Sequence, residues 1–164
     1  MTNYNFAPAA PDEQIVYGAC QPGYPSKSPD DNSVTEWIAQ MEAHGVERVC
    51  CLLDEKLDDY DSLLETYRDT FGSQNACHAP IEDYTVVSAD TFYTVILPFL
   101  QEADDVAEKV VVHCSAGMGR TGHVLVLWLV HGRKYKLEDA IRAVEQMGRS
   151  PHEAVTVDQL EAFC

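Results

Sequence analysis

A buried strand followed by a glycine-containing loop and an apolar helix is the feature that most constrains this chain. Residues 109–113 (KVVVH) form a continuous apolar run, which is typical of a central strand covered on both faces. The run passes into the loop CSAGMG, and an apolar helix is expected from about Thr121 onward. A strand that is covered on both faces needs helices on either side of its sheet. The segment therefore favours an α/β fold.

Strands and helices are predicted to alternate along the rest of the chain. Ser33 and Glu36 form an S-x-x-E capping box that would open the first helix. Pro98 is expected to kink or end the helix that Ser88 would cap. The apolar patterns predict strands at 14–20, 46–53, 75–81 and 109–113, and helices at 33–43, 60–71, 88–103, 121–130, 137–147 and 156–163. This alternation predicts a central, mostly parallel sheet flanked by helices on both faces.

The length of 164 residues fits one compact domain. Residues 1–13 are rich in Pro and Ala and predict an irregular arm, so we expect residues 14–164 to form a single domain. No apolar run approaches the roughly 20 residues that a membrane span needs. The first residues also lack the basic and apolar segments of a signal peptide. We therefore expect a soluble, cytoplasmic protein that is monomeric and has no membrane partner.

Acidic residues dominate the charge of the chain. Asp and Glu number 27 against 11 Lys and Arg, which gives a net charge of −16 at pH 7. Such a surface repels nucleic acid and anionic lipid, so neither is expected as a partner. A salt-rich host and an ordinary acidic protein would both explain this charge. The salt-rich host is favoured, because salt would screen the repulsion between the acidic groups.

The six cysteines are expected to be reduced thiols, because the chain shows no secretory signal. No CxxC pair is present, and Cys77-His78 has no matching second pair. The sequence therefore predicts neither a metal site nor a cofactor.

The loop after residues 109–113 has the chemistry of an anion site. It would place the Cys114 thiol beneath backbone N–H groups at a helix N-terminus, where donors and helix dipole favour a tetrahedral dianion. Gly117 and Gly119 allow the backbone to curl with its amides inward. Arg120 can grip two oxygens of the same anion, and these surroundings favour a thiolate. A buried cysteine at an ordinary turn would explain neither the glycines nor the arginine.

The segment HCSAGMGRTG resembles the signature of the Cys-dependent protein tyrosine phosphatase superfamily, which reads His-Cys, five residues, Arg, then Ser or Thr. The resemblance implies a protein tyrosine phosphatase-like fold, in which Cys114 attacks phosphorus and Arg120 holds the transferring group. It also implies that Thr121 stabilises the leaving thiolate and that His113 orients the loop and tunes the thiol. The implied phosphate-binding residues are Ser115, Ala116, Gly117, Met118, Gly119 and Arg120.

The sequence APIED is similar to the P-I-x-D element of small dual-specificity phosphatases, which lies on a mobile loop before the cysteine. Expelling an alkoxide or phenoxide needs a general acid, and hydrolysis of the phosphocysteine needs a base. Asp83 is the candidate for both roles, and Glu82 and Asp90 fit the element less well. The proline that often follows the acid in the family is absent from residues 85–87.

The likeness extends over residues 14–163, and the tail is similar to the late helical segment of cyclin-dependent-kinase-associated and related compact phosphatases. A late glutamine positions water in classical tyrosine phosphatases. Gln159 has a similar place, although the polar face of an amphipathic helix explains it better. Some relatives protect the nucleophile by a disulfide to a neighbouring strand. Here Leu53 stands nearest to that partner position, so Cys50 and Cys51 are expected in the core, with Cys51 the weaker redox option.

The resemblance implies hydrolysis of phosphate monoesters on proteins through a cysteinyl-phosphate intermediate. Phosphotyrosine is the expected substrate, and a shallow pocket would also accept phosphoserine and phosphothreonine. The variable loop positions are neutral, which suits polyanions poorly, so a phosphoinositide or another small phosphate ester is the alternative. A phosphate-binding module without turnover is a further alternative. Sulfur transfer is disfavoured by Arg120 and Asp83, and arsenate reduction by the distance of Cys114 from the N-terminus.

Overall fold

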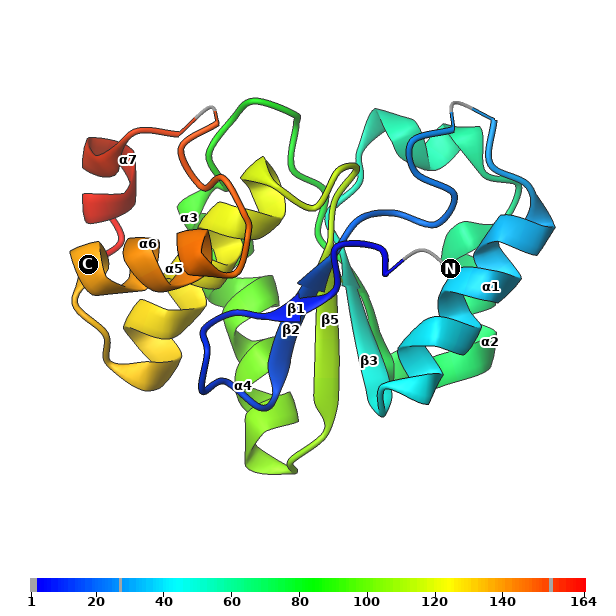
Figure 1. The fold of residues 1–164 in the computed structure, drawn as a ribbon, viewed down its shortest axis with the longest axis horizontal. Coiled ribbons are helices and arrows are strands. Elements are labelled where there is room, and N and C mark those ends of the chain that lie inside the picture. The colour runs from blue at the N-terminus through cyan, green and yellow to red at the C-terminus, as the bar shows by residue number, and fades with distance from the viewer. Residues whose placement is uncertain (1–2, 27, 154) are drawn as a thin grey trace.

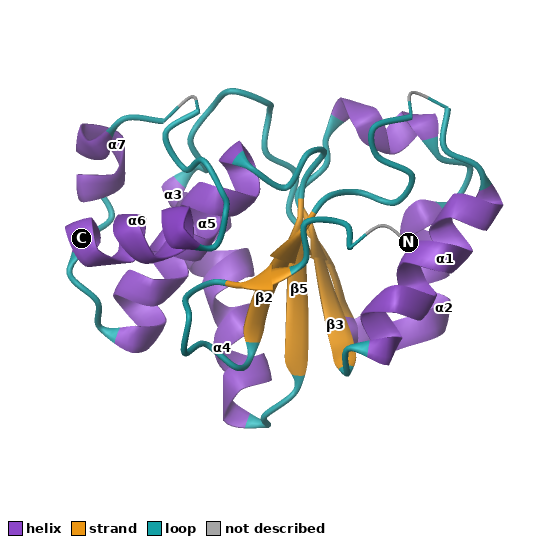
Figure 2. Cartoon of the chain, in the orientation of Figure 1, coloured by secondary structure: helices purple, strands orange, loops and turns teal. Residues whose placement is uncertain are grey.

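The computed structural model of the chain describes residues 3–26, 28–153 and 155–164. Within these residues a five-stranded sheet runs through the centre, with helices on both of its faces (Figures 1 and 2). The strands are β1 (Ala7–Pro8), β2 (Val16–Ala19), β3 (Val46–Cys51), β4 (Ala76–His78) and β5 (Lys109–His113). Their order is β1-β2-β5-β3-β4, and every neighbouring pair is parallel except β1 and β2. The predicted α/β fold with a mostly parallel sheet is confirmed.

Two layers of helices cover the sheet (Figure 1). One face carries α1 (Asp31–Ala43) and α2 (Leu63–Phe71). The other carries α4 (Leu97–Asp105), α5 (Gly119–Arg133) and α6 (Leu137–Gln146), with the short α3 (Ala89–Thr91) and α7 (Val157–Glu161) on the same side. Single helical turns of the 3-10 type lie at Glu55–Asp59 and Ser73–Asn75. In the described part of the chain, no helix has the length and apolar character needed to cross a membrane.

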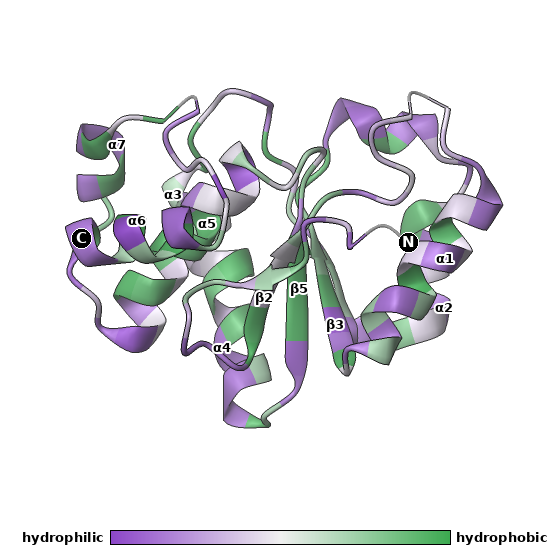
Figure 3. Cartoon of the chain, viewed as in Figure 1, coloured by the Kyte–Doolittle hydropathy of each residue, from purple (hydrophilic) through white to green (hydrophobic). Residues whose placement is uncertain are grey.

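The central strand β5 is apolar without alternation because both of its faces are buried (Figure 3). Val110 and Val112 belong to the core on one side of the sheet, whereas Val111 belongs to the core on the other side. All three side chains are fully buried. Burying each valine stabilises the fold by about 1.5–3 kcal/mol. The strand is therefore held firmly from both faces, and the loop that follows it starts from a rigid base.

The irregular arm predicted over residues 1–13 is wrong in one part, and residues 1 and 2 lie outside the described residues. Ala7–Pro8 form β1, which pairs antiparallel with the edge of the sheet. Proline is tolerated there because an edge strand needs no donor on its outer side. The carboxylate of Glu13 accepts from the N–H of Val16 and pairs with Arg133 of α5 at 2.9 Å. The arm is therefore part of the packed structure.

The predicted capping box at Ser33 and Glu36 is also wrong. Helix α1 begins two residues earlier, with Asp30 as its N-cap, and the Asp30 carboxylate accepts from the N–H of Ser33 at 2.8 Å. A carboxylate is a strong cap and it also favours the positive end of the helix dipole. A capping box does form at α7, between Thr156 and Gln159. The Gln159 side chain accepts there from the Thr156 N–H at 2.9 Å, so it caps a helix.

The helix predicted over 88–103 is modified around Pro98. Ser88 caps its start as expected, accepting from the N–H of Thr91 at 3.1 Å. A π-helical turn over Phe92–Ile96 then precedes α4. Pro98 comes just after this π-helical turn, and the backbone is helical at Ile96 and Leu97 across the junction. The helix therefore continues past the proline to Asp105, with a local change of helix type before it.

Candidate active site

The loop predicted to carry the chemistry lies at the carboxyl end of β5, where α/β sheets commonly bind ligands. The side chain of Cys114 is only 2% exposed. Gly117 has a φ of +77°, and a Cβ atom added to it would lie 2.6 Å from the carbonyl oxygen of Ala19. Only glycine fits where the loop crosses the end of β2 so closely. The structure thus supplies the reason for one of the two glycines singled out in the sequence.

The carbonyl groups of this loop point away from the pocket, toward other parts of the chain. The Ser115 carbonyl accepts from the Gln21 N–H at 2.8 Å, and the Ala116 carbonyl accepts from the Asn5 side chain at 3.2 Å. The Gly117 carbonyl accepts from the Arg149 guanidinium at 2.6 Å. In a trans peptide the next N–H points opposite to the carbonyl. The amides that follow these carbonyls are therefore turned toward the pocket.

The guanidinium of Arg120 is held between the loops that follow β3 and β4. It is 4% exposed and donates from Nη1 to the Ile81 carbonyl at 3.0 Å. The same Nη1 lies 3.6 Å from Asp54 Oδ1, and Nε lies 3.4 Å from Asp83 Oδ1. Among the described residues the buried Nε has no well-directed hydrogen-bond partner. Arg120 therefore keeps a donor for a ligand although it sits between two carboxylates.

Asp83 lies on the loop after β4, as predicted, and its side chain is half exposed. A pocket of about 220 Å³ lies above Cys114. Its described lining residues are Tyr24, Lys56, Asp83, Tyr84, Cys114, Ser115, Ala116, Gly119, Arg120 and Glu153. Neither Glu82 nor Asp90 is among these lining residues. The structure thus brings Asp83 together with the loop cysteine and arginine and leaves the two rival carboxylates outside.

Most of the predicted phosphate-binding residues line this pocket, namely Ser115, Ala116, Gly119 and Arg120. Gly117 and Met118 are not among the described lining residues; Gly117 has the positive φ that curves the loop, and Met118 is the N-cap of α5. Thr121 lies in the first turn of α5 and is fully buried. Its hydroxyl has no hydrogen-bond partner in the described part of the chain. A buried hydroxyl without a hydrogen-bond partner lowers the stability of the fold. Its presence here fits a hydroxyl that donates to an atom of the reaction.

His113 is fully buried behind the loop and is joined to it. Its Nδ1 lies 3.0 Å from the Cys114 carbonyl, and its Nε2 lies 2.9 Å from the Tyr67 hydroxyl. Burial lowers the pKa of His113 to about 4, so the ring is neutral at pH 7. A carbonyl only accepts, so the proton sits on Nδ1 and Nε2 accepts from Tyr67. Tyr67 is one of the buried residues of α2, and its local sequence does not mark it as part of a site.

Among the described lining residues of the pocket, Cys114 is the only cysteine. All six thiols are free. Cys51 is buried on β3, and burial raises the pKa of its thiol to about 12. Cys50 and Cys77 are register partners on β3 and β4, and so are Cys51 and His78. Among the described residues, no group of three or more His, Cys, Asp or Glu side chains is placed to hold a metal ion.

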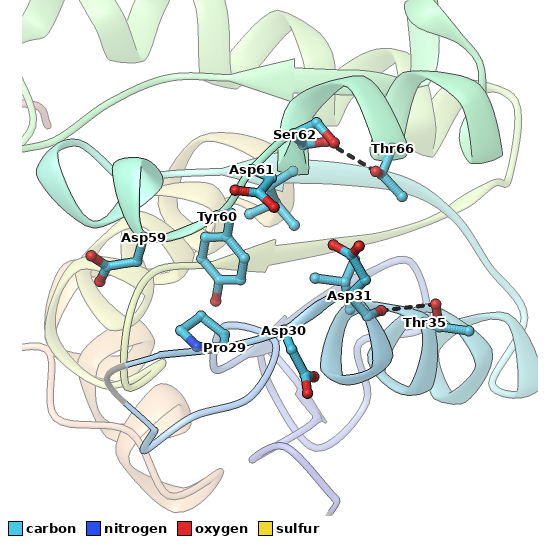
Figure 4. Close-up of a pocket in the computed structure, with 11 residues that line it drawn as sticks. Pro29, Asp30, Asp31, Thr35, Asp59, Tyr60, Asp61, Ser62 and Thr66 are labelled. Carbon is cyan, nitrogen blue, oxygen red and sulfur yellow. Dashed lines mark hydrogen bonds between the residues drawn. The ribbon is translucent and has the colours of Figure 1, made fainter.

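A larger hollow of about 400 Å³ lies beside the start of α1 (Figure 4). Its described lining includes four carboxylates, those of Asp30, Asp31, Asp59 and Asp61. The hydroxyls of Thr35 and Thr66 donate to backbone carbonyls, as the dashed lines in Figure 4 show. These carboxylates would repel a phosphate group. This hollow is therefore poorly suited to an anion.

Comparison with known proteins agrees with this geometry. A family model described as the catalytic domain of dual specificity phosphatases matches residues 33–160. The chain belongs to the dual specificity phosphatase family. The dual specificity protein phosphatase OPG106 of Vaccinia virus (strain Western Reserve) is 32% identical over 63 residues, which are 38% of this chain and 37% of the viral protein. The match thus spans little more than a third of that relative.

Solved structures show that the likeness of this dual specificity phosphatase domain extends to the whole fold. A mutant form of Tk-PTP superposes with a TM-score of 0.68 and 25% identity, covering 93% of this chain and 89% of that one. Kinase associated phosphatase (KAP), with its catalytic-site cysteine substituted by serine, superposes with a TM-score of 0.73 and 19% identity, covering 90% and 83%. At this low identity the KAP likeness concerns the fold alone.

Proposed function

We propose that this dual specificity phosphatase domain hydrolyses phosphate monoesters on proteins through a cysteinyl-phosphate intermediate. The observation that carries the proposal is the placement of Arg120. Its buried guanidinium lies beside Asp83 and lines the same pocket as Cys114, and among the described residues its Nε makes no well-directed hydrogen bond. A guanidinium held in this way can bind two oxygens of one phosphoryl group. The pocket above it has room for a single phosphate ester.

The first chemical step uses Cys114, Arg120 and Asp83. The Cys114 sulfur, as a thiolate, forms a bond to phosphorus while the bond from phosphorus to the side-chain oxygen breaks. Arg120 and the inward-facing loop amides hold the charge that builds on the phosphoryl oxygens. Asp83 gives its proton to the departing oxygen, so that an alcohol or phenol leaves and Asp83 becomes a carboxylate.

The second step restores the enzyme. Asp83, now a carboxylate, removes a proton from water while the water oxygen attacks phosphorus. The bond from sulfur to phosphorus breaks, and inorganic phosphate is released. The sulfur takes up the electron pair as a thiolate, and the unpartnered Thr121 hydroxyl can donate to it. His113 acts from behind the loop, through its bond to the Cys114 carbonyl.

Two exposed tyrosines at the rim of the pocket favour an aromatic substrate. Tyr24 is 38% exposed and Tyr84 is 66% exposed, and both rings line the pocket above Cys114. Exposed rings at the mouth of a pocket can pack against the ring of phosphotyrosine. Phosphotyrosine is therefore the favoured substrate, with phosphoserine and phosphothreonine as further substrates. The described lining also includes the cation of Lys56. A second cation could bind a second phosphate group, so a phosphoinositide is the alternative substrate.

The test of the nucleophile is the Cys114→Ser variant. It should lose turnover of a phosphotyrosine peptide while it still binds that peptide or vanadate. Phosphoserine peptide, p-nitrophenyl phosphate and a phosphoinositide, assayed in parallel with a chelator, would rank the substrate classes. Full activity of Cys114→Ser would overturn the assignment, and a phosphoinositide hydrolysed far faster than either peptide would overturn the protein substrate.

The test of the general acid is the Asp83→Asn variant. Its kcat should fall by roughly 100- to 10,000-fold, which is the usual contribution of a general acid. Glu82→Gln and Asp90→Asn are matched controls, because they make the same chemical change outside the pocket lining. A loss below tenfold in Asp83→Asn, or an equal loss in a control, would move the acid to another residue.

We also propose that the chain acts as one monomeric phosphatase domain, with the arm packed onto residues 14–164, in a cytoplasm rich in salt and without metal or cofactor. The net charge of −16 supports this environment, because salt screens the repulsion between acidic groups. Gel filtration should give a monomer, and the free energy of unfolding should rise between low and molar potassium chloride. Loss of activity in molar potassium chloride would contradict the salt-rich host.

A further inference from the structure

The N-terminal arm lies directly against the loop of residues 114–120, called the phosphate loop below. The arm precedes the residues that the family model matches. That match begins at residue 33. Tyr4 accepts through its carbonyl from the Cys20 N–H at 2.8 Å, which fixes the arm beside the end of β2. The Phe6 ring stacks on Tyr17 of β2 with ring centres 4.9 Å apart. The arm is thus anchored on both sides of Asn5.

Asn5 reaches from this anchored arm to the loop. Its side-chain Nδ2 donates to the Ala116 carbonyl at 3.2 Å, across 111 residues of sequence. Its backbone has a φ of +53°, a left-handed conformation that asparagine tolerates better than most residues. The donated hydrogen bond keeps the Ala116 carbonyl pointing outward. The Gly117 N–H, which belongs to the same peptide unit, is then turned toward the pocket.

Arg149 connects the arm and the loop a second time. It is 4% exposed and donates to the Gly117 carbonyl at 2.6 Å and to the Asn5 carbonyl at 2.6 Å. It forms no ion pair with a carboxylate in the described part of the chain. Its guanidinium lies over Gly18, where an added Cβ atom would come within 2.7 Å of Arg149 Nε. The missing side chain of Gly18 therefore leaves the space that this bridge occupies.

We propose that Asn5 is a positioning residue for the phosphate loop, holding the Ala116–Gly117 peptide in the orientation that binds the phosphoryl group. This inference rests on the proposed phosphatase function of the Cys114 pocket. Asn5 does not touch the phosphoryl group, and it acts through the loop backbone alone. The arm and Arg149 share the task, since one guanidinium binds the carbonyls of both Asn5 and Gly117.

Two variants of the full chain remove the Asn5 donor while they tolerate its backbone conformation. Asn5→Gly accepts a positive φ without strain, and Asn5→Asp is nearly the same size but presents an acceptor to the Ala116 carbonyl. Each should weaken inhibition by vanadate and lower kcat/KM by about twofold to tenfold, the range for one lost hydrogen bond. Asn5→Asp should lower kcat/KM more than Asn5→Gly does, because its carboxylate and the Ala116 carbonyl are both acceptors. A merely structural role would lower Tm and leave the vanadate inhibition constant unchanged well below Tm.

Matched controls come from Asn32, which lies at the exposed start of α1 away from the loop. Asn32→Gly and Asn32→Asp should keep the wild-type vanadate inhibition constant. In the double variant Arg149→Lys with Asn5→Gly, the fold-loss in kcat/KM should differ from the product of the two single fold-losses. Both residues hold the same loop, so their effects are coupled. Wild-type vanadate inhibition in both Asn5 variants would overturn this inference alone. A wild-type chain without phosphatase activity would instead overturn the proposed function.

Discussion

The hydroxyl of Tyr67 is expected to stabilise the protein through the buried histidine behind the phosphate loop. It donates to His113 Nε2 at 2.9 Å, and both side chains are fully buried. The Tyr67→Phe variant removes this donor and leaves Nε2 in the core, without access to water. An unsatisfied buried acceptor costs about 1–3 kcal/mol. The free energy of unfolding should therefore fall by about that amount.

Thermal and urea unfolding would measure this loss. For a chain of this size, each kcal/mol lowers Tm by about 2–4 °C, so a decrease of about 2–12 °C is expected. Tyr93→Phe is the matched control, because the Tyr93 hydroxyl donates to the Phe163 carbonyl at 2.8 Å while the residue is 41% exposed. Water can replace that bond, so the control should lose no more than about 0.5 kcal/mol. Equal losses in the two variants would refute the reasoning about the buried histidine.

Three further predictions concern the loop and its surroundings. Thr121→Val should slow the release of phosphate from the enzyme, so that rapid-quench experiments trap more phosphocysteine than in the wild type; unchanged trapping would remove the hydroxyl from the second step. Gly117→Ala should lose most phosphatase activity and bind vanadate weakly, because its Cβ atom would meet the Ala19 carbonyl at 2.6 Å. The free energy of unfolding should fall as the pH drops from 6.5 to about 4, since burial lowers the pKa of His113 and of His123 to about 4. The unfolded chain binds protons there that the folded chain does not, which amounts to about 3 kcal/mol for each histidine. Urea unfolding at several pH values would show no such fall if both rings were protonated in the fold, and about half of it if one ring were.

The sequence was sufficient for the parts of the site that lie close together along the chain. Cys114 and Arg120 stand within one strand–loop–helix segment, so spacing predicts that they meet, and the resemblance adds Thr121. Asp83 was found through a resemblance to a known loop, and the pocket lining includes it. The alternation of strands and helices likewise predicted the sheet and both helical layers, because apolar periodicity reports directly on burial.

The supporting residues could not be predicted, because each acts across a long separation. Tyr67 bonds to a residue 46 positions away, and Asn5 bonds to one 111 positions away. Nothing in the neighbouring sequence marks either residue, and only the packed sheet brings them to the loop. The error at the start of α1 has a different cause, since Asp30 and Ser33 are both good caps. The choice between them depended on where the preceding loop ends.

The position of the arm also has a practical consequence for handling the protein. The described chain starts at Asn3, two residues before the side chain that contacts the Ala116 carbonyl. The carboxyl end lies on the opposite side of the molecule, beside α6 and α7 (Figure 1). An affinity tag fused ahead of Asn3 would lie close to the arm that contacts this carbonyl, whereas a tag after Cys164 would not. Fusion at the carboxyl end therefore leaves the contact between the arm and the loop undisturbed.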